Sequence, residues 1–281
     1  METLFEPFQF EFFRNGIIVA VLVGGLCGLI GVYIVLRGMS YIGHGLSHAI
    51  FGGAVVAFVM SWNFYLGAGM WGFLAAVLIN QTARRTKINA DAAIGVITTA
   101  SFAVGVALIS RYRRFTQSFD AALFGNILGV TTADLWVVAG VTLMVALAIF
   151  FLYKQLLFMT FDAEVARVYG VKTEWIDTLF ALILAAALIA SMQILGVTLI
   201  AAALVIPAIT ARLLTDSFNR MILLSVFIGA LSGFIGMYFS FYIDVASGAS
   251  IVLLQAGLFS LALVFSSLRQ RAARRLIHTH L

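Results

Sequence analysis

Long apolar segments follow one another along almost the whole chain, separated by short polar links. A membrane-spanning helix needs about 20 mostly apolar residues, and most of the segments approach this length. Apolar residues make up 63% of the 281 positions and charged residues only 10%, which leaves too few polar side chains to cover a water-soluble globule. The sequence therefore predicts an all-α, polytopic membrane protein.

The apolar segments predict eight or nine transmembrane helices. We place the spans near residues 17–36, 46–62, 64–80, 91–110, 135–153, 177–190, 194–211, 221–242 and 249–267. The sixth is short, so Gly196 marks either a break or a loop. Segment 117–130 is too short to cross, and we expect a re-entrant or surface helix there. Residues 1–16 then form an N-terminal interfacial segment, 17–268 a single transmembrane domain, and 269–281 a basic tail.

The basic residues indicate which side of the membrane each end of the chain faces. Cytoplasmic loops are enriched in Lys and Arg, and nine spans with the N-terminus outside place most of the 17 Lys and Arg, including Arg269 to Arg275, in the cytoplasm. We therefore expect a cytoplasmic C-terminus; the N-terminus would also be inside if 4–15 were interfacial or one span were broken. Because the net charge of +5 comes from residues that flank apolar runs and not from one patch, we expect the lipid bilayer and no nucleic acid as partner.

Two of the four histidines lie at the entrance to the second apolar segment, in the sequence His44-Gly45-Leu46-Ser47-His48. A spacing of four places both imidazoles on one helix face, with Cβ atoms roughly 6 Å apart, so that they can share one divalent metal ion. Imidazole suits zinc, copper, iron and nickel more than magnesium or calcium, and an ionisable pair inside a membrane indicates a functional site. The alternative is that each histidine hydrogen-bonds a neighbouring helix and contributes only to packing.

An enzymatic interpretation of the same spacing is less favoured. His-x-x-x-His on a helix resembles the zinc site of metalloproteases, in which a glutamate after the first histidine is the general base. Gly45 occupies that position, and no Glu lies in any expected span. The chain also contains no Gly-x-x-x-x-Gly-Lys-Ser/Thr motif for phosphate binding. We therefore predict that the chain is not an enzyme and that any ATP hydrolysis belongs to a separate subunit.

Four sequence blocks resemble one family of transporters. The blocks are Arg37 through Ala49, Asp91 through Val96, Leu123 through Val130 followed by Asp134-Leu135, and Gly196 through Asp216. In this order they resemble the metal-permease family of ABC importers for zinc, manganese or iron, over residues 16–267. The resemblance implies the ABC importer permease fold in the plasma membrane of a bacterium or archaeon. It also implies a second permease chain, most simply an identical copy, a cytoplasmic ATP-binding subunit, and an extracellular metal-binding lipoprotein.

The chain departs from the family pattern at one informative position, because His44 stands where the family usually has Asp. In the family, that Asp and the following His line the metal path, which implies this role for His44 and His48. Two chains would bring four imidazoles to one tetrahedral ion. We expect a transported zinc or manganese ion and no permanently bound cofactor, with imidazole nitrogen favouring zinc. Asp91 is a further candidate ligand, although a helix cap or a salt bridge explains it more simply.

A polar segment between two spans is the expected contact with the ATPase. Residues 160–170 predict a short amphipathic helix, in which Asp162 and Glu164 suit the N-terminal end of the helix dipole and Arg167 the C-terminal end. Gly170 is placed to stop this helix. The family resemblance implies a coupling helix here, formed by Asp162, Glu164, Ala166, Arg167 and Gly170; an ordinary solvated loop is the alternative.

A secondary carrier, coupled to protons or sodium ions and working without an ATPase, is the alternative function. Such a carrier needs an ionisable side chain to hold the coupling ion inside the membrane. No Asp, Glu or Lys lies in the middle of an expected span. The sequence therefore favours an ATP-driven importer of a divalent transition metal.

Overall fold

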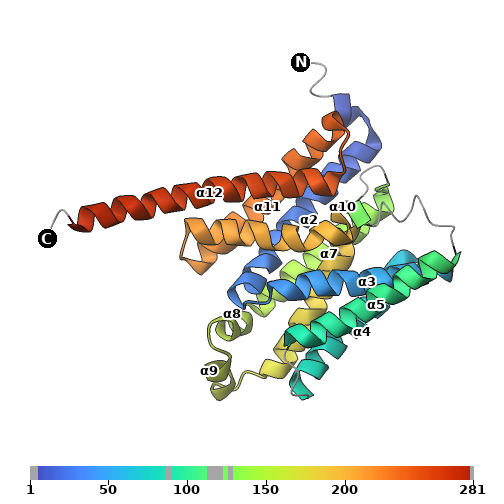
Figure 1. Cartoon of the computed structure of the whole chain (residues 1–281), viewed down its shortest axis with the longest axis horizontal. Coiled ribbons are helices and arrows are strands. Elements are labelled where there is room, and N and C mark those ends of the chain that lie inside the picture. Colours follow the sequence, from blue (N-terminus) through green and yellow to red (C-terminus); the bar gives the residue numbers. More distant parts are fainter. Residues whose placement is uncertain (1–5, 86–89, 113–122, 126–128, 279–281) are drawn as a thin grey trace.

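The computed structural model describes residues 6–85, 90–112, 123–125 and 129–278, and the regular elements within these ranges are all helices (Figure 1). They are η1 (Glu6–Gln9), α2 (Glu11–Leu36), α3 (Ser40–Val59), α4 (Phe64–Arg85), α5 (Ala90–Tyr112), α7 (Thr132–Phe151), α8 (Tyr153–Phe161), α9 (Ala163–Val168), α10 (Thr173–Leu214), α11 (Phe218–Ile243) and α12 (Ser247–His278). Among the described residues, 9 segments are long and apolar enough to cross a membrane, two of them within α10. The predicted all-α polytopic class is confirmed.

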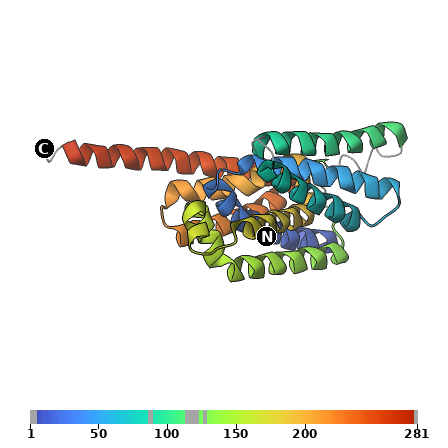
Figure 2. The ribbon, with the colours of Figure 1, turned by 90° about the horizontal axis from the view of Figure 1, so that it is seen from below.

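Most of the helices extend a few residues beyond the predicted spans. α2 begins at Glu11, inside the predicted interfacial segment 1–16, and α12 continues as a helix to His278, through most of the predicted tail. This end of α12 projects away from the rest of the bundle (Figure 2). Hydropathy marks only the part of a helix that suits lipid, whereas backbone hydrogen bonds continue into polar flanks. The predicted re-entrant segment 117–130 lies mostly outside the described residues.

The second span differs from its prediction in a way that matters for the histidines. α3 begins at Ser40, six residues before the predicted start at 46, because Gly and His interrupt the apolar pattern without interrupting the helix. His44 and His48 therefore lie within this candidate span and not at its entrance. The spans in α2, in α3 and at 173–192 are the most buried of the candidate spans, whereas those in α7 and α12 are the least buried.

Glycines bring α2 and α11 into backbone contact. A Cβ atom at Gly24 would overlap the carbonyl oxygen of Gly229, and one at Gly233 would overlap that of Ala20. Small residues permit such close approach, which favours association of helices in lipid, where no hydrophobic drive acts between them.

α10 contains a sharp turn instead of a loop. Gly196 has φ of 72°, and the chain changes direction there, so that the two halves of α10 run separately through the bundle (Figure 1). Leu123 and Gly125 pack directly on this turn, because a Cβ at Gly196 would overlap the carbonyl oxygen of Leu123. The hydroxyl of Thr198 also donates a hydrogen bond of 2.8 Å to that oxygen. The turn separates two full-length candidate spans, so the sixth span is not short as predicted.

Candidate metal path and ATPase-docking surface

His44 and His48 lie one turn apart on α3, with their imidazoles turned toward each other. The two Nε2 atoms are 3.3 Å apart, and the ring planes meet at 88°. Two imidazole nitrogens bound to one tetrahedral zinc ion, at about 2.05 Å each, lie about 3.3 Å from each other. The pair therefore has the spacing of two ligands that face one ion. The same distance also fits a hydrogen bond between two neutral rings, so it is compatible with the packing alternative as well.

The surroundings of the histidine pair are open on one side. His44 is exposed and His48 is partly buried, with the His48 ring packed edge-on against Phe102 of α5 at a centroid distance of 4.8 Å. The Nδ1 atom of His48 is buried and makes no hydrogen bond to any described residue. Histidines that hold a metal tightly usually donate this second N–H to a partner, and its loss weakens binding about 10- to 100-fold. The arrangement suits an ion that is passed on more than one that is retained.

Ser47, directly before His48, connects α3 to the turn of α10. The hydroxyl of Ser47 lies 2.8 Å from the carbonyl oxygen of His44 and 3.3 Å from the carbonyl oxygen of Val197. Val197 follows Gly196 directly. The histidine pair and the α10 turn are therefore neighbours.

Glycines on α3 set its distance from α5. A Cβ at Gly45 would overlap the side chain of Ile94, and a Cβ at Gly52 would overlap the carbonyl oxygen of Ser101. This close approach lets the Phe102 ring reach His48. α3 remains one continuous helix through the Gly-Gly pair at 52–53.

Asp91, the third candidate ligand, is not brought into a cluster with the histidines. It is exposed in the first turn of α5, where its charge suits the helix dipole. The described residues contain no group of three or more His, Cys, Asp or Glu side chains that could hold a metal ion together. Within this part of the chain, the histidine pair therefore has no third side chain of these types close enough to share an ion with it.

The short helix predicted within residues 160–170 is present as α9, but it begins later than predicted. α8 ends at Phe161, and Asp162 leaves helical geometry with φ of −155° and ψ of 99°. Its carboxylate accepts a hydrogen bond of 2.9 Å from the N–H of Val165 and so caps α9. A short polar side chain that binds the backbone N–H groups ahead of it favours the start of a new helix over continuation of the old one. Residues 160 and 161 therefore belong to α8 and not to the predicted short helix, whereas Glu164 and Arg167 lie in the first and last turns of α9 as expected.

The C-terminal end of α9 follows the prediction for Gly170. This residue has φ of 84°. Its N–H donates a hydrogen bond of 3.0 Å to the carbonyl oxygen of Arg167, and the N–H of Val171 donates one of 3.0 Å to the carbonyl oxygen of Ala166. These two bonds form a Schellman motif, which requires a left-handed residue and favours glycine. Ala166 is fully buried, so it holds α9 to the bundle.

Apolar side chains around α9 remain uncovered in the single chain. The exposed fractions are 66% for Phe161, 85% for Val168 and 75% for Tyr169. Beside them is a cavity of about 550 Å³ lined by Arg167, Val171, Lys172, Thr173, Glu174, Trp175 and Thr178. Exposed apolar residues with a polar rim are typical of protein–protein contact sites.

One buried ion pair was not predicted from the sequence. Arg37, named there only as the first residue of a family block, donates from Nη1 to Oδ1 of Asp177 at 3.2 Å, and the arginine side chain is only 7% exposed. Burial lowers the pKa of the Arg37 guanidinium, and the charge of Asp177 acts in the opposite direction. The partners are 140 positions apart, so no local pattern identifies them.

Comparison with known proteins extends over most of the chain. The model of the ABC 3 transport family matches residues 9–266. The manganese transport system membrane protein MntC of Halalkalibacterium halodurans is 39% identical over 258 residues, which cover 92% of this chain and 88% of that protein. The manganese import system permease protein ScaB of Streptococcus gordonii is 38% identical over 267 residues, 95% of each chain. The solved structure of PsaBC from Streptococcus pneumoniae in complex with Fab superposes with a TM-score of 0.84 and 34% identity, covering 92% of this chain and 94% of that one.

Proposed function

The chain belongs to the ABC 3 transport family, and from this premise we propose that His44 and His48 line the path by which it passes a divalent transition metal into the cell. The chain is the permease subunit of an ABC importer, not the subunit that hydrolyses ATP. Such a permease works in the plasma membrane with an ATPase and a substrate-binding protein. The observation that supports this role for the two histidines is the 3.3 Å separation of their Nε2 atoms.

A second copy of the permease is proposed to complete the coordination of the ion. His44 is exposed on the surface of the single chain, so a ligand from another chain can approach it. An identical partner related by a twofold axis would add two imidazoles, and four nitrogen ligands satisfy tetrahedral zinc. The ion would move on when the two chains separate, because neither copy alone supplies enough ligands to retain it.

The proposed cargo is zinc or manganese, with zinc favoured by the residue at position 44. The relatives MntC and ScaB are named for manganese. Manganese prefers oxygen ligands, whereas imidazole nitrogen suits zinc. The relative affinity of this chain for zinc and manganese therefore depends on whether His44 binds the ion.

α9 is proposed as the coupling helix, and Asp162, Glu164, Ala166, Arg167 and Gly170 as the residues that form it. The exposed apolar side chains next to it offer a contact for the ATPase. This assignment places α9 and the C-terminal end of α12 in the cytoplasm, in accordance with the positive-inside rule. A lipoprotein that captures the metal would then dock on the opposite side, and residues 17–268 would act as one transmembrane domain.

Uptake of radioactive zinc and manganese into proteoliposomes tests the proposal. The permease is reconstituted with its ATPase and binding protein, and the variant His44→Ala, His48→Ala is compared with the matched variant His278→Ala, His280→Ala. We expect the first variant to lose metal uptake and metal-stimulated ATP hydrolysis, and the second to retain both. Normal uptake by the first variant would assign the histidines to packing. Uptake by the permease without any ATPase would favour the ion-coupled carrier.

A further inference from the structure

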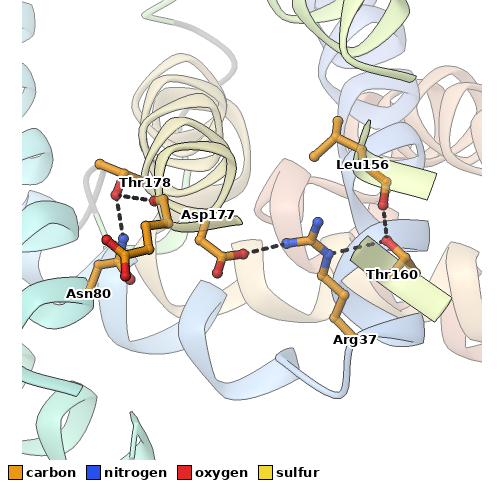
Figure 3. Close-up of polar contacts among 7 residues, drawn as sticks. Arg37, Asn80, Leu156, Thr160, Asp177 and Thr178 are labelled. Atoms are coloured by element: carbon orange, nitrogen blue, oxygen red, sulfur yellow. Dashed lines mark hydrogen bonds and ion pairs between the residues drawn. The ribbon is translucent and has the colours of Figure 1, made fainter. Parts of the chain in front are cut away.

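Arg37 joins α2, α8 and α10, and its contacts with Thr160 and Asp177 are drawn in Figure 3. It follows α2, its Nε donates to Oγ1 of Thr160 in α8 at 3.2 Å, and its Nη1 donates to Oδ1 of Asp177 in α10 at 3.2 Å. Its Cζ atom also lies 4.7 Å from the centre of the Phe180 ring, in a cation–π contact. The guanidinium is therefore fixed from several directions.

The position of Arg37 in the chain places it directly before the histidine helix. Its own N–H closes the last turn of α2 on the carbonyl oxygen of Tyr33 at 3.0 Å. Gly38 follows with φ of 67° and with no neighbouring atom that a Cβ would meet, and α3 begins at Ser40. Because a helix rises 1.5 Å per residue, His44 lies only about 6 Å along the helix from this start. Residues 37–39 form the α2–α3 corner. Movement of this corner therefore moves the N-terminal end of α3, the helix that carries His44.

Thr160 gives Arg37 an equally short connection to α9. The Thr160 hydroxyl donates to the carbonyl oxygen of Leu156 at 2.6 Å, which leaves its oxygen free to accept from Arg37. Two residues later Asp162 caps α9. α8 and α9 are thus joined by a single residue, so a displacement of α9 reaches Thr160 directly.

The burial of Arg37 is expensive for a residue with a purely structural role. A buried ion pair often adds no stability over an apolar pair of the same volume, because desolvation offsets the attraction. The Nη2 atom of Arg37 is buried and makes no hydrogen bond to any described residue, which adds a further penalty. A rigid, planar guanidinium can, however, hold several helices in one relative orientation.

We propose that Arg37 is a positioning residue for transport, which transmits displacement of α8 and α9 to the start of α3 and so to the histidine pair. The inference rests on the proposed function. Transporter helices move as packed rigid bodies and not as continuously deformable segments. The contact of Arg37 with Thr160 couples α8 to the α2–α3 corner, while its contact with Asp177 couples the same corner to α10. An ATPase that moves α9 would thereby change the orientation of His44 and His48.

A neighbouring hydrogen bond offers a matched control. Asn80 of α4 donates from Nδ2 to Oγ1 of Thr178 at 2.7 Å, and this hydroxyl donates to the carbonyl oxygen of Glu174 at 2.9 Å. The contact lies in the same part of α10 as Asp177, but it joins α10 to α4 and not to α8 (Figure 3). Loss of this hydrogen bond weakens a helix contact in the same region but leaves the contacts of Arg37 with α8 and α10 intact.

The test compares Arg37→Gln, Thr160→Val and Asn80→Leu in the reconstituted importer; Asn80→Leu removes the control hydrogen bond and leaves Thr178 in place. The readouts are ATP hydrolysis with and without metal-loaded binding protein, and the number of metal ions taken up per ATP hydrolysed. Loss of a charge-assisted hydrogen bond corresponds to about a tenfold effect or more, so we expect Arg37→Gln to reduce uptake per ATP about tenfold. Thr160→Val should reduce it in the same direction, and Asn80→Leu should leave it unchanged. Melting temperatures in detergent control for unfolding.

Each result supports or overturns the inference. Unchanged uptake per ATP in Arg37→Gln or Thr160→Val would overturn it, and Thr160→Val decides alone if Arg37→Gln does not assemble. An equal loss in Asn80→Leu would also overturn it, because the loss of any contact with this part of α10 would then have the same effect. If the unmodified complex shows no metal-dependent ATP hydrolysis, the proposed function fails and the inference with it. If the Arg37 and Thr160 variants respond to metal like the unmodified complex, and only the histidine double variant loses the response, the inference is overturned and the proposed function stands.

Discussion

Gly52→Ala is predicted to weaken the contact that holds α3 against α5 beside the histidine pair. The new Cβ would overlap the carbonyl oxygen of Ser101, and one turn further along α5 a Cβ at Gly105 would lie 3.2 Å from the Cα of Gly52. Carbon–oxygen contacts of this kind relax to about 3.3 Å or more, so the two helices must separate by about 1 Å. A gap of that size forfeits up to about half of the dispersion energy of each affected contact, and overpacking of this kind costs about 1–3 kcal/mol.

The matched control for this prediction is Gly95→Ala in α5, where a Cβ would meet no atom within 4 Å. Both substitutions gain up to about 1 kcal/mol of helix propensity, so the difference between the two variants isolates the steric term. Chemical denaturation in detergent should show Gly52→Ala to be about 1–3 kcal/mol less stable than Gly95→Ala. Its metal-stimulated ATP hydrolysis should also be lower, because Phe102 and His48 move apart. Equal stability and equal stimulation would mean that α3 and α5 do not meet at Gly52.

Three further predictions concern α9, the α10 turn and the bound metal. Asp162→Ala removes the N-cap of α9, at a cost of about 1 kcal/mol, and should reduce the amount of ATPase that co-purifies with the permease; full recovery would contradict the coupling role of α9. Gly196→Ala places an L-residue at φ of 72° and ψ of 161°, a conformation essentially confined to glycine, at a cost of about 1–3 kcal/mol before any overlap; it should lower the yield of monodisperse permease in size-exclusion chromatography, whereas a normal yield would argue against the turn. Chelators should leave the fold intact, but zinc at about 100 times its dissociation constant should stabilise the permease by about 2.7 kcal/mol in thermal melts. That stabilisation should be absent when His44 and His48 are both alanine, and its persistence would indicate a different site.

The class of fold could be predicted from the sequence because each span must satisfy its backbone hydrogen bonds internally and be apolar in lipid. The histidine pair could be predicted for a similar reason, since residues four apart on a helix are neighbours whatever the tertiary structure. Gly170 was also predictable, because a helix C-terminus with a left-handed residue has a local sequence signal.

Features that depend on contacts between distant segments could not be predicted. The start of α3 at Ser40 could not be read from hydropathy, because a helix continues wherever tertiary contacts support it. The contact of Arg37 with Asp177 joins residues 140 positions apart, and nothing in either neighbourhood identifies its partner.

The most direct test of the histidine path is equilibrium binding of zinc and manganese to the purified permease, with and without the substitution His44→Asp. If both imidazoles bind the ion, the unmodified permease should prefer zinc, and the carboxylate should shift the ratio of affinities toward manganese by about tenfold or more. A ratio that is the same in both proteins would contradict the claim that His44 binds the transported metal.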